Sequence, residues 1–156
     1  MVKRLIYDAD LLSVLSDDGV YNVETKTFEN LTIQNVSDVK EKMGTPPWGA
    51  RVVYNELFGC VLICQNPGEG NRLHYHEDAD ECWFIVEGEW EWFIEGFGKK
   101  KGRAGDMIVV QKGIKHQITC VGVSPGIRLA ITKPDVNHIY INDTREKAHK
   151  GTRFSD

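Results

Sequence analysis

The feature that most constrains the fold is a pair of histidines one residue apart, His74 and His76, followed by Glu81. In an extended strand, side chains alternate between faces, so both imidazoles lie on one face, about 7 Å apart along the strand. Glu81 follows a short acidic turn and can fold back to the same point. His116 lies beyond a second segment bounded by glycines. Three imidazoles and a carboxylate suit a transition metal better than calcium or magnesium, so these residues predict a metal-binding β-protein.

The spacing of the first group resembles a sequence motif of the cupin superfamily. That motif consists of a glycine, five residues, His-x-His, three or four residues, a glutamate, six residues and a second glycine. Every position of the motif is matched in this chain, by Gly68, His74, His76, Glu81 and Gly88. The match is specific because both the residue types and all the spacings agree.

A second group resembles the second cupin motif, which is a glycine, five residues, Pro-x-Gly, two residues, a histidine, three residues and an asparagine. Gly105, Gly113 and His116 match it, whereas Gln111 replaces the usual proline and Cys120 replaces the usual asparagine. The resemblance implies a small single-domain metal-binding cupin of all-β fold, a double-stranded β-helix or jelly-roll barrel. It also implies that His74, His76, Glu81 and His116 together bind one divalent transition metal. Iron is expected first, with manganese, nickel, zinc or copper as alternatives.

The rest of the chain predicts a series of short strands around these motifs. Apolar and alternating segments bounded by turn residues favour strands at 51–54, 60–65, 72–76, 82–87, 89–95, 107–111, 117–121 and 127–132. A hairpin is expected within 20–33, and one helical turn over 37–44, with Ser37 as its cap and Gly44 at its end. We therefore expect an N-terminal extension over 1–47 that packs on the barrel, the cupin barrel over 48–141, and a polar tail over 142–156.

Composition excludes several other classes of protein. With 156 residues and a net charge of −4, the chain fits one domain and offers no basic face for nucleic acid. Its apolar runs are too short to cross a membrane, and the N-terminal residues contain no signal-peptide core. We expect a cytoplasmic protein with four reduced cysteines. The resemblance to cupins implies a homodimer.

Strand parity gives candidate residues for substrate binding. Arg72 precedes His74 by two residues and would share its face, where the guanidinium can bind a carboxylate or phosphate. Trp83 or Trp92 can form the wall of a pocket, while Trp90, Trp92 and Ile94 are expected to be buried. Further candidates for substrate binding are Gln111, Cys120 and, more weakly, Tyr54. His138 and His149 lie outside both motifs and are assigned to the surface.

These residues are compatible with three functions, all involving a small-molecule ligand. The first is an oxygenase, in which the cation activates a small organic substrate toward dioxygen and Glu81 serves as a catalytic base. The second is a sugar or sugar-phosphate isomerase, epimerase or lyase that uses the cation as a Lewis acid. The third is a non-catalytic module that binds a small molecule. The oxygenase ranks first, because no second acid–base residue stands out within the motifs.

Overall fold

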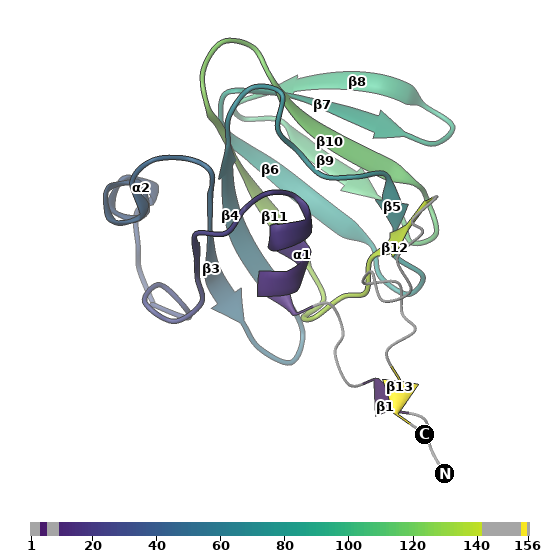
Figure 1. Cartoon of the computed structure of the whole chain (residues 1–156), viewed down its shortest axis with the longest axis horizontal. Helices are drawn as coiled ribbons and strands as arrows, with labels where there is room; N and C mark the ends of the chain where they lie inside the picture. Colours follow the sequence, from purple (N-terminus) through teal and green to yellow (C-terminus); the bar gives the residue numbers. More distant parts are fainter. Residues whose placement is uncertain (1–3, 6–9, 142–153, 156) are drawn as a thin grey trace.

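Alternating side chains along the central strands give the chain two β-sheets that face each other, a jelly-roll arrangement (Figure 1). A computed structural model of the protein describes residues 4–5, 10–141 and 154–155, with side chains described over 10–141. Two short segments, β1 (Arg4–Leu5) and β13 (Phe154–Ser155), pair with each other apart from the two main sheets. The predicted all-β jelly roll is confirmed.

The larger sheet has six strands, and all its pairs are antiparallel except that of β2 with β3. In spatial order the strands are β2 (Val23–Glu24), β3 (Trp48–Tyr54), β4 (Gly59–Gln65), β11 (Gly126–Thr132), β6 (Glu81–Glu87) and β9 (Met107–Val110). The central position of β11 matters for the site, because its inward-facing residues lie between those of β4 and β6.

The smaller sheet carries His74 and His116 and has five strands. In spatial order they are β12 (Ile139–Tyr140), β5 (His74–Tyr75), β10 (His116–Val121), β7 (Glu89–Ile94) and β8 (Gly98–Arg103). The register of β10 places His116 directly opposite His74 on β5. Two residues that are 42 positions apart in the sequence therefore become neighbours through backbone pairing.

The space between the sheets is filled by an aromatic and aliphatic core. Trp83 and Trp92 meet edge to face with ring centroids 5.7 Å apart, and Trp90 lies 6.4 Å from Trp92. The prediction that Trp90, Trp92 and Ile94 are buried is confirmed for the two tryptophans, whereas Ile94 is only partly buried. Leu15 from the helix α1 (Leu11–Asp17) joins the same cluster and is 2% exposed. The N-terminal part of the described chain thus contributes directly to the space between the sheets.

Two helices lie outside the sheets (Figure 1). α1 begins after Asp10, whose carboxylate accepts a hydrogen bond from the Ser13 N–H. α2 (Val36–Met43) begins after Asn35, two residues before the predicted Ser37 cap, and ends at Gly44 as expected. Neither helix is long and apolar enough to cross a membrane, and the same holds for every helix in the described residues.

Two predictions of secondary structure differ from the observed elements. The hairpin expected within 20–33 is wrong: only β2 forms there, and it pairs in parallel with β3. The Glu24 carboxylate accepts hydrogen bonds from the N–H groups of Lys26 and Thr27, which turns the chain and ends the strand. Strand β8 was not expected, because its three consecutive lysines show no alternation. The proposed boundaries at residues 47 and 141 stay predictions, and most of the tail over 142–156 lies outside the described residues.

Candidate metal centre

Three strands bring the predicted ligands together at one end of the space between the sheets. His74 begins β5, His76 follows that strand directly, Glu81 begins β6 and His116 begins β10. All four side chains are buried, with 1–7% of their surface exposed. One nitrogen or oxygen from each lies within 4.8 Å of those of the other three. The four residues therefore form a compact group that can hold one cation.

Hydrogen bonds to backbone carbonyls fix which nitrogen of each imidazole faces the centre. The Nδ1 atoms of His74 and His116 lie 2.7 Å from the Arg72 oxygen and 2.9 Å from the Ile114 oxygen. The Nδ1 of His76 lies 2.7 Å from the Asn137 oxygen. A carbonyl only accepts hydrogen bonds, so each Nδ1 carries the proton and each Nε2 carries a lone pair. This is the arrangement of metal-binding histidines, whose second nitrogen is bonded to a carbonyl or carboxylate.

The contacts at the centre bring the Glu81 carboxylate against two of these nitrogens. Glu81 Oε1 lies 2.7 Å from His76 Nε2 and 3.8 Å from His116 Nε2. His116 Nε2 is buried, and no group among residues 10–141 forms a hydrogen bond with it. Three lone pairs and a carboxylate that converge in a buried space repel one another unless a positive charge lies between them. The residues present therefore fit a divalent cation.

The electrostatics of the cluster favour a neutral His74 and an ionised Glu81, as a metal requires, and a proton on His76 that a metal would displace. Burial, together with the neighbouring His116, His138 and His76, holds the pKa of His74 well below its usual value. Burial opposes the charge of Glu81, but the two nearby imidazoles outweigh it and lower the pKa of this carboxyl. For His76, burial is outweighed by the charge and hydrogen bond of Glu81, so its pKa is raised. His74 is thus neutral and Glu81 ionised near neutral pH.

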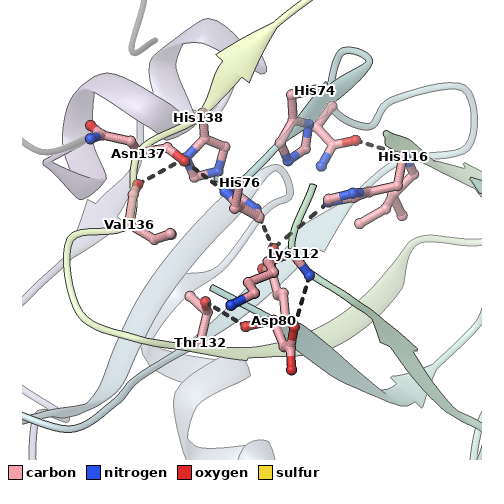
Figure 2. A network of polar contacts seen from close by, with 12 residues as sticks. His74, His76, Asp80, Lys112, His116, Thr132, Val136, Asn137 and His138 are labelled. Carbon is pink, nitrogen blue, oxygen red and sulfur yellow. Dashed lines mark hydrogen bonds and ion pairs between the residues drawn. The ribbon is translucent and has the colours of Figure 1, made fainter. Parts of the chain in front are cut away.

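Two hydrogen bonds to Asp80 hold the turn that precedes Glu81 in place (Figure 2). The Asp80 carboxylate accepts a hydrogen bond from the Lys112 N–H at 2.8 Å, in the loop before β10. The Thr132 hydroxyl donates to the Asp80 carbonyl at 3.2 Å, from the end of β11. These bonds tie the start of β6 to the two strands beside it and so set the position of Glu81.

A fourth histidine, His138, lies directly against the cluster (Figure 2). Its ring stacks on His74 with centroids 4.7 Å apart and meets His76 edge to face at 4.6 Å. Its Nδ1 is bonded to the Val136 carbonyl at 3.1 Å. The sequence had suggested a surface position, because His138 lies outside both motifs. The chain after β11 returns to pair with β5, and no sequence pattern signals that return.

A cavity of about 90 Å³ opens beside the cluster. His74, Glu81 and His138 lie on its wall, together with Trp83, whose ring meets His116 edge to face at 5.4 Å. Leu15, Asp18, Tyr54 and Arg128 also line this cavity. Trp92 lies behind Trp83 in the core and does not line this cavity. Tyr54 bonds through its hydroxyl to the Asp135 carboxylate.

The remaining candidates for substrate binding lie away from this cavity. Arg72 packs over the Tyr140 ring at 4.0 Å, with Nη2 3.5 Å from Asp17 Oδ2. The prediction that Arg72 shares the face of His74 assumed that side chains alternate regularly between these residues. However, β5 begins only at His74, and the loop before it is not an extended strand. Gln111 is exposed in the turn before β10, and Cys120 is buried in the core. His149 lies outside the described residues.

Comparison with known proteins agrees with the motifs. Residues 61–132 match the protein family described as the cupin domain. None of the curated proteins with which the sequence was compared matches it.

Several solved structures share the fold. One is an uncharacterized conserved protein with a double-stranded β-helix domain from Klebsiella pneumoniae, with 19% identity and a TM-score of 0.62, covering 73% of this chain and 94% of that one. KdgF from Halomonas sp. has 21% identity and a TM-score of 0.51, with 55% and 78% covered. A cupin-superfamily sugar phosphate isomerase from Silicibacter pomeroyi has 24% identity and a TM-score of 0.50, with 56% and 58% covered. This chain thus spans less than two thirds of the isomerase, and the likenesses show the fold.

Proposed function

Because residues 61–132 of this chain are a small cupin domain, we propose that the protein is a metal-dependent enzyme acting on a small polar molecule. The observation that carries this proposal is the convergence of three imidazole lone pairs and one carboxylate on a single buried point. Structural metal sites are closed, whereas this cluster lies on the wall of a cavity. A cation bound there is accessible to a small molecule.

The chain supplies several groups around such a molecule. A divalent cation held by His74, His76, Glu81 and His116 supplies Lewis acidity and open coordination positions. Trp83 forms a flat apolar wall beside His116 and limits the orientation of a ligand. His138 places an imidazole on the same wall, beside the space that a ligand would occupy.

His138 is also the observation that favours an isomerase, epimerase or lyase over an oxygenase. The sequence motifs contain no acid–base residue besides Glu81, and the structure places a fourth imidazole beside the ligands. A reaction that moves a proton next to a polarised carbonyl uses such a group, whereas activation of dioxygen depends on the metal itself. The fold likeness to a sugar phosphate isomerase is compatible with this ranking. Oxygenase activity, with iron as the metal, is the second candidate.

The two reactions are separated by measuring metal content and turnover together. Protein purified without chelator is analysed for metals and then screened against thiols, enediols and diketones for oxygen uptake. The same protein is screened against sugars and sugar phosphates in D₂O for exchange of carbon-bound hydrogen by NMR. We expect hydrogen exchange without oxygen uptake. Substrate-dependent oxygen uptake by an iron-loaded protein would instead support the oxygenase.

A variant of His138 tests its role in this reaction. His138→Asn keeps a hydrogen-bonding group of similar length but removes the imidazole, so we expect full metal content and hydrogen exchange at least about tenfold slower. Turnover equal to that of the wild type would remove His138 from the mechanism. Metal content falling with turnover would make His138 a support of the ligands.

The remaining sequence-based expectations are retained as proposals. We expect the protein to be cytoplasmic and homodimeric, and not to bind nucleic acid. The outer face of the larger sheet exposes Phe84, Met107 and Val109 at 38%, 80% and 66%, an apolar surface that supports self-association.

A further inference from the structure

Arg128 lies outside both sequence motifs. It is a buried cation on the wall of the cavity. It lies on β11, between Ile63 of β4 and Ile85 of β6, and is 2% exposed. Its guanidinium stacks on Trp90, with Cζ 4.6 Å from the ring centroid, and Nη1 donates to Gln65 Oε1 at 2.5 Å. Its Nε is buried, and no acceptor among residues 10–141 forms a hydrogen bond with it.

This guanidinium has no direct anionic partner within the described part of the chain. Gln65 is neutral, and no carboxylate oxygen of residues 10–141 forms an ion pair with Arg128 within 4.0 Å. Burial lowers the pKa of Arg128 to about 10, so the group remains charged at neutral pH. A buried charge without a partner is strongly unfavourable unless a ligand supplies the opposite charge.

The cavity connects this charge with the metal cluster. Arg128 is level with Ile85, four residues along β6 from Glu81, which corresponds to about 13 Å of strand. Both Arg128 and Glu81 line the same cavity, and Leu15 of α1 contributes an apolar wall. Asp18, directly after α1, also lines it, and its Oδ1 is buried without a hydrogen-bond partner among the described residues. The cavity thus has a metal-binding end and a cationic end.

We propose that the cavity binds a short organic acid, with a carboxylate on Arg128 and an oxygen-bearing group at the cation. This inference rests on the proposed function and adds the chemical class of the substrate. A carboxylate fits better than a phosphate for two reasons. The guanidinium keeps donors beyond the one that Gln65 accepts, and two of them match the two oxygens of a carboxylate. The carboxyl of Asp18 nearby, when ionised, would repel a dianion more than a monoanion.

The test uses dicarboxylates as probes, from malonate to adipate, with the diamide of each acid as the uncharged match. Binding to the zinc-loaded full-length protein is measured by calorimetry for the wild type, Arg128→Met and Arg72→Met. Methionine fills the space of a buried arginine without its charge, so the Arg128→Met protein should fold and melt at a temperature equal to or above that of the wild type. Arg72 is the matched control, because it lies outside the cavity.

We expect one chain length to bind best, and Arg128→Met to weaken that acid about tenfold or more. The diamide should bind the wild type no more tightly than the acid binds Arg128→Met, and Arg72→Met should bind the acid like the wild type. Equal affinity of the acid for wild type and Arg128→Met would overturn the inference. Tighter binding of inorganic phosphate than of every dicarboxylate would overturn the choice of substrate class.

A second variant of Arg128 and a titration without metal distinguish failure of this inference from failure of the proposed function. If Arg128→Met does not fold, Arg128→Gln removes the charge but keeps a polar side chain beside Gln65, and unchanged affinity in that variant would overturn the inference. Titrations are repeated on protein stripped with chelator. Binding of the acid that depends on Arg128 but not on metal would support the contact between the carboxylate and Arg128, and it would contradict the proposed function. Metal binding with acid affinity insensitive to Arg128 would contradict the inference alone.

Discussion

At the scale of single residues, the orientation of the histidines is set by short local hydrogen bonds. His74, His116 and His138 each direct Nδ1 to the carbonyl two residues earlier in the chain. His76 differs, because its partner is Asn137 in the loop after β11. Local bonding orients most of the rings, so the motif residues alone go far toward defining the centre. The contact of His76 with Asn137 ties that centre to a segment outside both motifs.

Asp18 provides a residue-scale prediction about pH and stability. Burial, partly offset by Arg128, raises the pKa of this carboxyl from 3.8 to about 7. The folded protein therefore holds a proton that the unfolded chain releases at lower pH, and stability falls as the pH rises from about 4 to about 7. Asp18→Asn, which cannot ionise, should raise the melting temperature at pH 8. The gain has an upper limit of about 4 kcal/mol, from three pKa units.

The same comparison at pH 4.5 serves as the control for Asp18→Asn. Both proteins then carry an uncharged group at this position, so their melting temperatures should nearly coincide. A difference of equal size at both pH values, or a less stable variant at pH 8, would contradict the assignment.

At the scale of elements, the strands near the motifs were predictable and the segments around them were not. The strands predicted over 60–65, 82–87 and 107–111 show apolar alternation or runs bounded by turn residues, and they form within one residue of these bounds. The lysines of β8 show neither pattern, and they form a strand because their backbone pairs with that of β7. Arg128 was missed because the parity argument was anchored on the motif strands alone. Parity was misleading for Arg72, where the strand is shorter than the sequence suggests.

Gly70 gives a prediction for the loop that leads into β5. The loop lies so close to β10 that a Cβ at Gly70 would meet the Ile118 carbonyl oxygen at 2.0 Å. Gly70→Ala must therefore move the loop away from β10, which displaces His74, four residues later. We expect a loss of stability of about 1–3 kcal/mol in chemical denaturation and weaker zinc binding.

Gly59→Ala is the matched control for this change. A Cβ at Gly59 would lie 3.6 Å from Pro134 Cα, an ordinary contact, so the alanine costs no rearrangement there. Zinc affinity equal in the two alanine variants would show that the loop does not set the position of His74.

At the scale of the whole molecule, the site is completed by segments that lie far from the motifs. α1 closes one side of the cavity with Leu15, and the segment between β11 and β12 supplies His138 and the carbonyl that holds His76. Both depend on how the chain returns to the sheets after leaving them, which periodicity and motif spacing do not encode. The motif residues predicted the cluster itself, whereas the shape and charge of the cavity beside it emerged only from the tertiary structure.

The most direct test of the account is the number of metal ions bound per chain, measured by calorimetric titration of zinc into stripped protein. We expect one equivalent for the wild type and for His138→Ala, whose ring lies beside the cluster without being one of its four ligands. We expect His116→Ala to lose about 100-fold or more in affinity, because one of four ligands is removed. A wild-type protein that binds no metal, or a His116→Ala protein that still binds one equivalent as tightly, would contradict the central claim.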